Sequence, residues 1–170
     1  EWNEISASAC ELVLCTDALH VERYRTKGFE SLLFPLETDD RVFRPLGLDK
    51  SFDVMISGNV AKSGRRQFLA EVAEGIQPFN LEVWDRYKDK ASFQDLNIRY
   101  NMSRIVLNLS HAGQPVTSPT TQGLSPVDPY WSAKGRIQEA ALAGTAVISE
   151  AFPSQAAMFP ELITFSDVET

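Results

Sequence analysis

Short apolar runs alternate with longer stretches of helical period along most of this chain, and this alternation limits the folds it can adopt. Apolar runs of about four to eight residues between polar residues are typical of buried strands. Strands joined by a helix pair in parallel, because the helix carries the chain back to the start of the sheet. We therefore expect an α/β protein with a doubly wound, Rossmann-like parallel sheet that helices cover on both faces. The predicted strands are residues 11–16, 30–36, 52–58, 80–85, 103–110, 145–150 and 162–167, and the predicted helices are 17–28, 65–76, 93–102, 133–144 and 154–159.

The strand and helix pattern is interrupted between Thr38 and Lys50, where the sequence is polar and contains Pro45 and Gly47. We interpret this stretch as a linker. Residues 1–46 then form a terminal strand–helix–strand unit of one sheet together with linker, and residues 47–170 form most of a second sheet. The second series ends after a strand with no helix to cover it, so we expect the chain to be a piece of a longer protein.

The composition excludes some classes of protein. The net charge is −7, whereas nucleic-acid binders present basic surfaces, so we expect no nucleic-acid partner. No apolar run approaches the roughly 20 residues that span a bilayer, and no signal peptide opens the chain. Cys10 and Cys15 have neither redox-motif nor zinc-site spacing, which favours two small core thiols in a reducing compartment. We predict a cytoplasmic protein without a membrane span.

The first candidate site is the loop that follows the strand 52–58. Gly58 and Gly64 let the backbone approach a ligand, and the next helix begins there with its anion-binding N-terminus. Lys62, Arg65 and Arg66 add cationic donors, and an arginine fork matches phosphate oxygens. The loop has neither the P-loop nor the dinucleotide-binding glycine motif. A solvated basic turn is the alternative interpretation.

The second candidate site is the small-residue stretch "KGRIQEAALAGTAVIS", which carries Arg136 and Glu139 on one face of a predicted helix. A carboxylate only accepts hydrogen bonds, and its two oxygens suit the vicinal hydroxyls of a ribose. A phosphate at the same helix end would bind the guanidinium of Arg136. The alternative is a single ion pair on the helix surface.

Four segments resemble GT-B glycosyltransferases of one bacterial branch, the spore-maturation-type, glycosyltransferase-like proteins of group 1. "GRIQEAALAGTAVISE" is similar to their E-A-x-A-x-G-T-x-V helix-to-strand signature, and "YNMSRIVLNLS" to a Y-x-x-S-K-I-x-L-N element before it. "FDVMISGNVAKSGRRQFL" resembles their first strand and loop, and "PLETDDRVFRP" resembles the linker between their two domains. These segments occur in the family's order, over about Leu12 to Phe165.

The resemblance implies the C-terminal, donor-binding half of a GT-B enzyme, preceded by the last strand–helix–strand unit of its N-terminal domain. Such an enzyme transfers a sugar from a nucleoside diphosphate donor, such as a UDP- or GDP-sugar, to an acceptor (glycan, lipid or protein) that the sequence does not identify. It needs no metal or other cofactor. Carried over by position, Glu139 holds the ribose hydroxyls and Arg136, with Arg65 or Arg66, stabilises the leaving diphosphate. The positions that line the donor site are Gly58, Asn59, Lys62 and Gly135.

One position departs from the family. Many retaining members carry a second acidic residue eight positions before the ribose glutamate, and Trp131 stands there in this chain. The stereochemical outcome therefore stays open. Trp84 and Tyr100 either stack on a base or belong to the core, and His20 is either a base or a surface residue of its helix. A competing hypothesis is a non-catalytic Rossmann-like module that binds a nucleotide or a partner.

Overall fold

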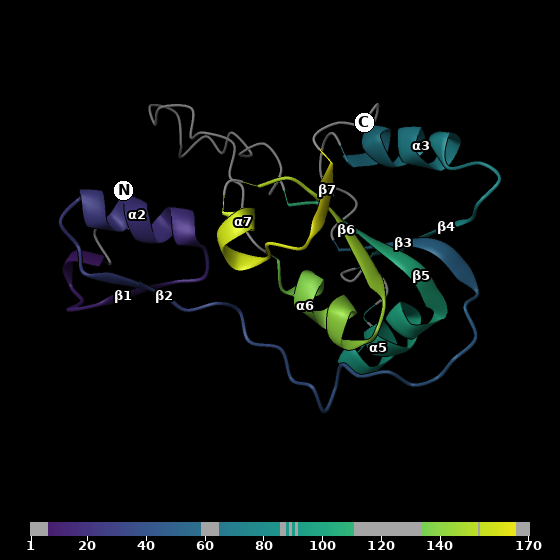
Figure 1. Ribbon diagram of the computed structural model, residues 1–170, viewed down its shortest axis with the longest axis horizontal. Helices are drawn as coiled ribbons and strands as arrows, with labels where there is room; N and C mark the ends of the chain where they lie inside the picture. Colours follow the sequence, from purple (N-terminus) through teal and green to yellow (C-terminus); the bar gives the residue numbers. More distant parts are fainter. Residues whose placement is uncertain are drawn as a thin grey trace.

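The computed structural model describes residues 7–58, 65–85, 88, 90, 92–110, 134–152 and 154–165, without the side chains of Leu19, Arg65 and Arg66. Two parallel sheets are found within these residues, one of two strands and one of five (Figure 1). The strands are β1 (Val13–Cys15), β2 (Ser31–Leu33), β3 (Phe52–Gly58), β4 (Leu81–Asp85), β5 (Ser103–Asn108), β6 (Ala146–Glu150) and β7 (Ile163–Phe165). The helices are α2 (Ala18–Thr26), α3 (Arg65–Gly75), α5 (Phe93–Met102), α6 (Gly135–Leu142) and α7 (Gln155–Met158).

The predicted α/β class is confirmed. The larger sheet has the order β4-β3-β5-β6-β7 with every neighbouring pair parallel, which is compatible with a Rossmann-like fold. Each predicted strand and helix has a counterpart, although most are shorter than predicted. For example, β2 ends at Leu33, ahead of Pro35, whose nitrogen has no hydrogen to donate to a neighbouring strand.

Helices cover both faces of the five-stranded sheet, with α3 on one side and α5 and α6 on the other (Figure 1). Neighbouring residues of a strand point to opposite faces. On β3, Ile56 therefore packs with Val72 of α3, whereas Met55 packs with Tyr100 of α5 and Ala140 of α6. α7 lies beside α6, where Phe152 and Ile137 form a further apolar cluster.

The unit β1–α2–β2 is covered on one face. α2 ends before Gly28, whose φ of 85° is a left-handed conformation that glycine adopts readily. Beneath the helix, the Ser31 hydroxyl donates to the backbone oxygen of Val21 at 2.9 Å. The opposite face presents exposed apolar side chains, namely Leu12, Leu14, Leu32 and Phe34.

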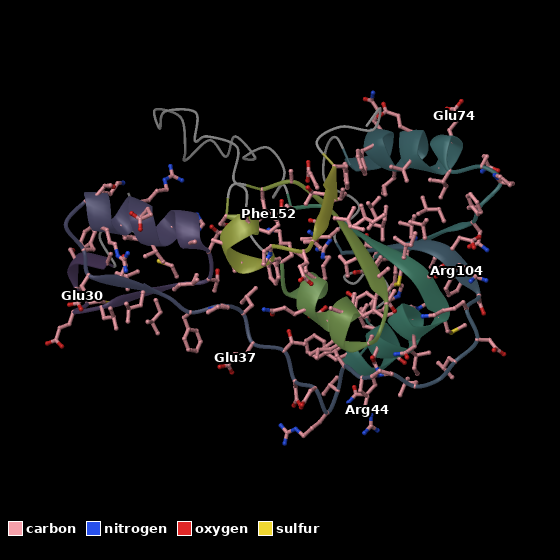
Figure 2. The ribbon with its side chains drawn as sticks, in the orientation of Figure 1. Glu30, Glu37, Arg44, Glu74, Arg104 and Phe152 are labelled. Carbon is pink, nitrogen blue, oxygen red and sulfur yellow. The ribbon has the colours of Figure 1, made fainter. Side chains whose placement is uncertain are left out.

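The predicted linker contributes to the core of the larger sheet. Phe43 is only 5% exposed and belongs to the same cluster as Met55 and Tyr100, upstream of the domain boundary that we placed at position 47. Two α5 side chains hold the backbone around it, since Asn97 accepts from the nitrogen of Arg44 and Asn101 from that of Leu46. The Arg44 side chain itself is exposed (Figure 2). No helix within the described ranges is long and apolar enough to cross a membrane.

Candidate functional site

The larger sheet changes winding direction beside β3. The chain moves from β3 to β4 on one side and then returns to β5 on the other side of β3. In doubly wound sheets, such a reversal opens a crevice at the carboxyl ends of the two strands, and ligands bind there. β3 ends at Gly58, and the chain after β5 leads to α6, so both predicted site segments flank this reversal.

A cavity of about 280 Å³ lies at this place. Its walls come from the end of β3, the end of β4, α5, the first turns of α6 and the segment that follows β2. The residues that line it are Leu36, Glu37, Ser57, Gly58, Trp84, Leu96, Tyr100, Lys134, Gly135, Arg136 and Glu139. The chain thus brings together groups that are up to a hundred residues apart in the sequence.

Arg136 lies directly against the backbone of Gly58. A Cβ atom built on Gly58 would be 2.8 Å from Nη2 of Arg136 and 3.3 Å from its Cζ. Gly58 has a φ of 133°, which side-chain-bearing residues rarely adopt, so glycine is needed here for both conformation and space. Arg136 is in the first turn of α6, whose backbone N–H groups also carry partial positive charge. Guanidinium and helix end together form a positive wall.

Glu139 lies one turn further along α6, and Tyr100 reaches it from α5. The Tyr100 hydroxyl donates to Oε2 of Glu139 at 3.2 Å and is 3.1 Å from the Ser57 hydroxyl. Tyr100 is 0% exposed, and Ser57 is 5% exposed. Burial raises the pKa of Tyr100 well above its usual value, and the nearby Glu139 charge raises this pKa further. Tyr100 is therefore a neutral donor at physiological pH.

The predicted site residues divide into three groups. Gly58, Gly135, Arg136 and Glu139 line one cavity. Arg65 and Arg66 form the start of α3, where only their backbone is described. Asn59, Lys62 and Trp131 lie outside the described residues.

The contacts that two further residues of the site make with each other and with Glu139 were not predicted from the sequence. Tyr100 belongs to the core, as one of the two interpretations had it, yet its hydroxyl also faces Glu139. Ser57 precedes the glycine that we singled out, and strand alternation places its side chain on the α5 face. The signal that could have found Ser57 is a polar residue at the end of an otherwise apolar strand.

A buried polar row continues along this end of the sheet. Asn108 of β5 and Ser149 of β6 are register partners, and Ser57 of β3 and Asn108 each come two residues after the paired residues Met55 and Val106. All three therefore lie on the α5–α6 face. The Asn108 amide nitrogen donates to the Ser149 hydroxyl at 2.8 Å and to the Ser110 hydroxyl at 3.0 Å. Asn108 is therefore part of the packed interior.

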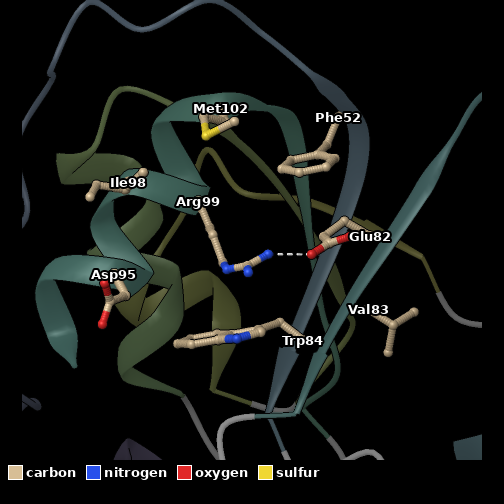
Figure 3. Close-up of a pocket in the computed structure, with 8 residues that line it drawn as sticks. All are labelled: Phe52, Glu82, Val83, Trp84, Asp95, Ile98, Arg99 and Met102. Atoms are coloured by element: carbon tan, nitrogen blue, oxygen red, sulfur yellow. Dashed lines mark hydrogen bonds and ion pairs between the residues drawn. The ribbon is translucent and has the colours of Figure 1, made fainter. Parts of the chain in front are cut away.

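A second cavity, of about 600 Å³, lies between the edge strand β4 and α5 (Figure 3). Its one arginine, Arg99, makes an ion pair with Glu82, and its guanidinium carbon is 5.5 Å from the centre of the Trp84 ring. Figure 3 shows the guanidinium between these two groups. A carboxylate and an aromatic ring of the cavity wall thus hold this cation.

The other titratable groups include the two cysteines: Cys15 is buried, as predicted, whereas Cys10 is exposed, so the prediction of a core thiol was wrong there. His20 is partly buried on α2, in the small two-stranded unit, and burial lowers its pKa. Asp85 ends β4 and accepts from the backbone nitrogen of Lys88 at 3.3 Å. In the part of the chain that the structure describes, no three acidic, histidine or cysteine residues gather as metal ligands would.

No known family model matches the chain, and a search of curated proteins found no match either. The resemblance to GT-B glycosyltransferases therefore stays a prediction from the four quoted segments. The geometry of the cavity provides separate grounds for a function.

Proposed function

We propose that this cavity binds the nucleoside diphosphate part of a sugar donor, and that the chain is the donor-binding domain of a GT-B glycosyltransferase. The observation that carries the proposal is the meeting of three features in one cavity. These are a glycine strand end, an arginine pressed against it, and a carboxylate one helical turn away. The acceptor is a glycan, lipid or protein.

Glu139 is the group that would bind the ribose. Its carboxylate offers acceptors only, and two vicinal hydroxyls can each donate to one of its oxygens. Hydrogen bonds to a charged group are about twice as strong as neutral ones. Glu139 is partly buried in the cavity and accepts from a buried tyrosine, so it does not lie on an exposed helix surface.

Arg136 and the first turn of α6 would bind the diphosphate. Their positive charges lie against the end of β3, where a phosphate can approach the backbone because Gly58 has no side chain. In sugar transfer, negative charge develops on the departing diphosphate, and fixed positive groups stabilise it. Arg65 and Arg66 begin α3 just along the chain and are proposed to add charge to the same group.

The size of the cavity supports binding of part of a donor. Sites for whole small molecules usually measure about 300–1,000 Å³. The volume of about 280 Å³ is near the lower end, which fits a ribose and phosphates better than an entire nucleotide sugar.

Calorimetric titration with UDP, GDP and ADP tests the proposal. We expect one of them to bind the wild-type chain, and Glu139→Ala and Arg136→Ala each to weaken that binding at least about tenfold, the loss of one hydrogen bond to a charged group. Glu74→Ala is the matched control, because Glu74 is exposed near the end of α3 and points away from the sheet (Figure 2). Absence of binding by all three nucleotides at millimolar concentration, or unchanged binding by Glu139→Ala, would contradict the proposal.

Turnover separates an enzyme from a binding module. Release of nucleoside diphosphate from UDP- or GDP-sugars by the full-length protein would support glycosyl transfer. Tight nucleotide binding with no release from any donor would favour the non-catalytic alternative.

A further inference from the structure

Tyr100 is held more firmly than a side chain that only fills space would need to be. Its ring is fully buried between the sheet and α6, with the Phe43 ring centre 6.2 Å away. Its backbone oxygen accepts from the Thr145 hydroxyl at 2.6 Å, which ties the end of α5 to the start of β6. The core therefore holds the ring and backbone of Tyr100 in place.

The direction of the hydrogen bonds around Tyr100 follows from counting hydrogens. A hydroxyl carries one hydrogen, and an ionised carboxylate only accepts. The Tyr100 hydrogen therefore goes to Oε2 of Glu139, and the Ser57 hydroxyl must donate its own hydrogen to the Tyr100 oxygen. The result is a one-way chain from Ser57 through Tyr100 to Glu139. Each bond in such a chain polarises and strengthens the next.

We propose that Tyr100, oriented by Ser57, is a positioning residue that sets the Glu139 carboxylate for a ribose diol and makes the site select ribonucleotides over 2′-deoxyribonucleotides. This inference rests on the proposed function. A glutamate side chain has three rotatable bonds, and a fixed donor on one oxygen removes much of that freedom before the ligand binds. A 2′-deoxyribose lacks one of the two hydroxyls and cannot use both oxygens of the fixed carboxylate.

Two single-group variants test the inference. Tyr100→Phe removes only the phenolic oxygen from a ring that packs in the core, and Ser57→Ala removes the donor behind it. Tyr24→Phe is the matched control, because Tyr24 lies on α2 and packs on Phe29 in the small unit. The measurement is the dissociation constant for UDP, GDP and ADP and for their 2′-deoxy counterparts.

For the wild type and Tyr24→Phe, we expect the ribonucleotide to bind at least about tenfold more tightly than its 2′-deoxy form, since one hydrogen bond to a charged group is at stake. Tyr100→Phe should lose most of this preference, because it should weaken the binding of the ribonucleotide and leave the binding of the 2′-deoxy form unchanged. Ser57→Ala should lose part of it. A merely structural role for Tyr100 would weaken both forms equally and leave their ratio unchanged.

The possible failures are distinguishable. If the wild type binds a nucleotide and Glu139→Ala abolishes binding, but Tyr100→Phe and Ser57→Ala keep the wild-type ratio, this inference is wrong and the proposed function stands. If Tyr100→Phe does not fold, the inference is tested by Ser57→Ala alone, through the ratio of its dissociation constants for the 2′-deoxyribonucleotide and the ribonucleotide. If no nucleotide binds the wild type, both proposals fall.

Discussion

The two faces of the five-stranded sheet are built from the same strands and serve different purposes. The face under α3 carries an apolar cluster that includes Ile56, Leu107 and Ile148. The face under α5 and α6 starts in the same way, at Met55 and Val106, but ends in the polar row of Ser57, Asn108 and Ser149. Burying polar groups costs free energy unless they find partners. The α3 face thus serves packing, whereas the α5–α6 face has polar side chains in place of apolar ones near the cavity.

The largest expected effect on stability comes from the α3 face. Ile56 is 1% exposed, so Ile56→Ala should lower the free energy of unfolding by about 2–5 kcal/mol. Nucleotide affinity of the folded fraction should not change. Urea unfolding measures the change in stability, and nucleotide titration measures the affinity. Val83→Ala is the milder control, because Val83 of β4 is 39% exposed. A large loss of nucleotide affinity in Ile56→Ala would contradict the view that only the α5–α6 face contributes to binding.

Gly58→Ala should affect both stability and binding. The φ of 133° strains alanine by about 1–3 kcal/mol, and the new methyl group would displace the Arg136 guanidinium. We expect nucleotide binding to weaken at least about tenfold, as for other losses of a charged contact. Gly75→Ala is the matched control, since a Cβ there has no atom within 4 Å and should stabilise α3 by up to about 1 kcal/mol. Equal behaviour of the two variants in titration would refute the role of Gly58.

Ser149→Ala tests the polar row with a smaller change. The Ser149 hydroxyl accepts from Asn108 and donates to the backbone oxygen of Glu150 at 2.9 Å. Asn108 keeps its bond to Ser110, so the expected cost is only about 0.5–1.5 kcal/mol. Thermal unfolding measures it. An increase in stability would show that the row is not maintained for its hydrogen bonds.

The smallest effect is a dependence on pH. The pKa of Tyr100 is raised in the folded state, whereas an unfolded tyrosine ionises near pH 10. The unfolded state therefore loses the proton first, and the stability that this group contributes is full below about pH 10 and is lost as pH rises beyond it. Between about pH 9 and 11, the free energy of unfolding of the wild type should fall more steeply than that of Tyr100→Phe. Parallel curves would mean that Tyr100 is not insulated from water.

Periodicity and strand-end rules predicted most of the fold and part of the site. Apolar runs located every strand, and the rule that ligands bind at the carboxyl ends of parallel strands brought Gly58 together with Arg136 and Glu139. The contact from Tyr100 to Glu139 could not be predicted in this way. It depends on how α5 packs against α6, and local spacing carries no information about that packing. Val42 and Phe43 form an apolar pair in a polar stretch, and a pair is too short to show a period.

The burial of Phe43 has a practical consequence for dissecting the protein. A recombinant fragment that started at position 47 would lose this ring from the interior, at an expected cost of about 3–5 kcal/mol. The same fragment would leave the amides of Asn97 and Asn101 without the backbone groups that they bind. Expression trials of the larger sheet should therefore start no later than position 38.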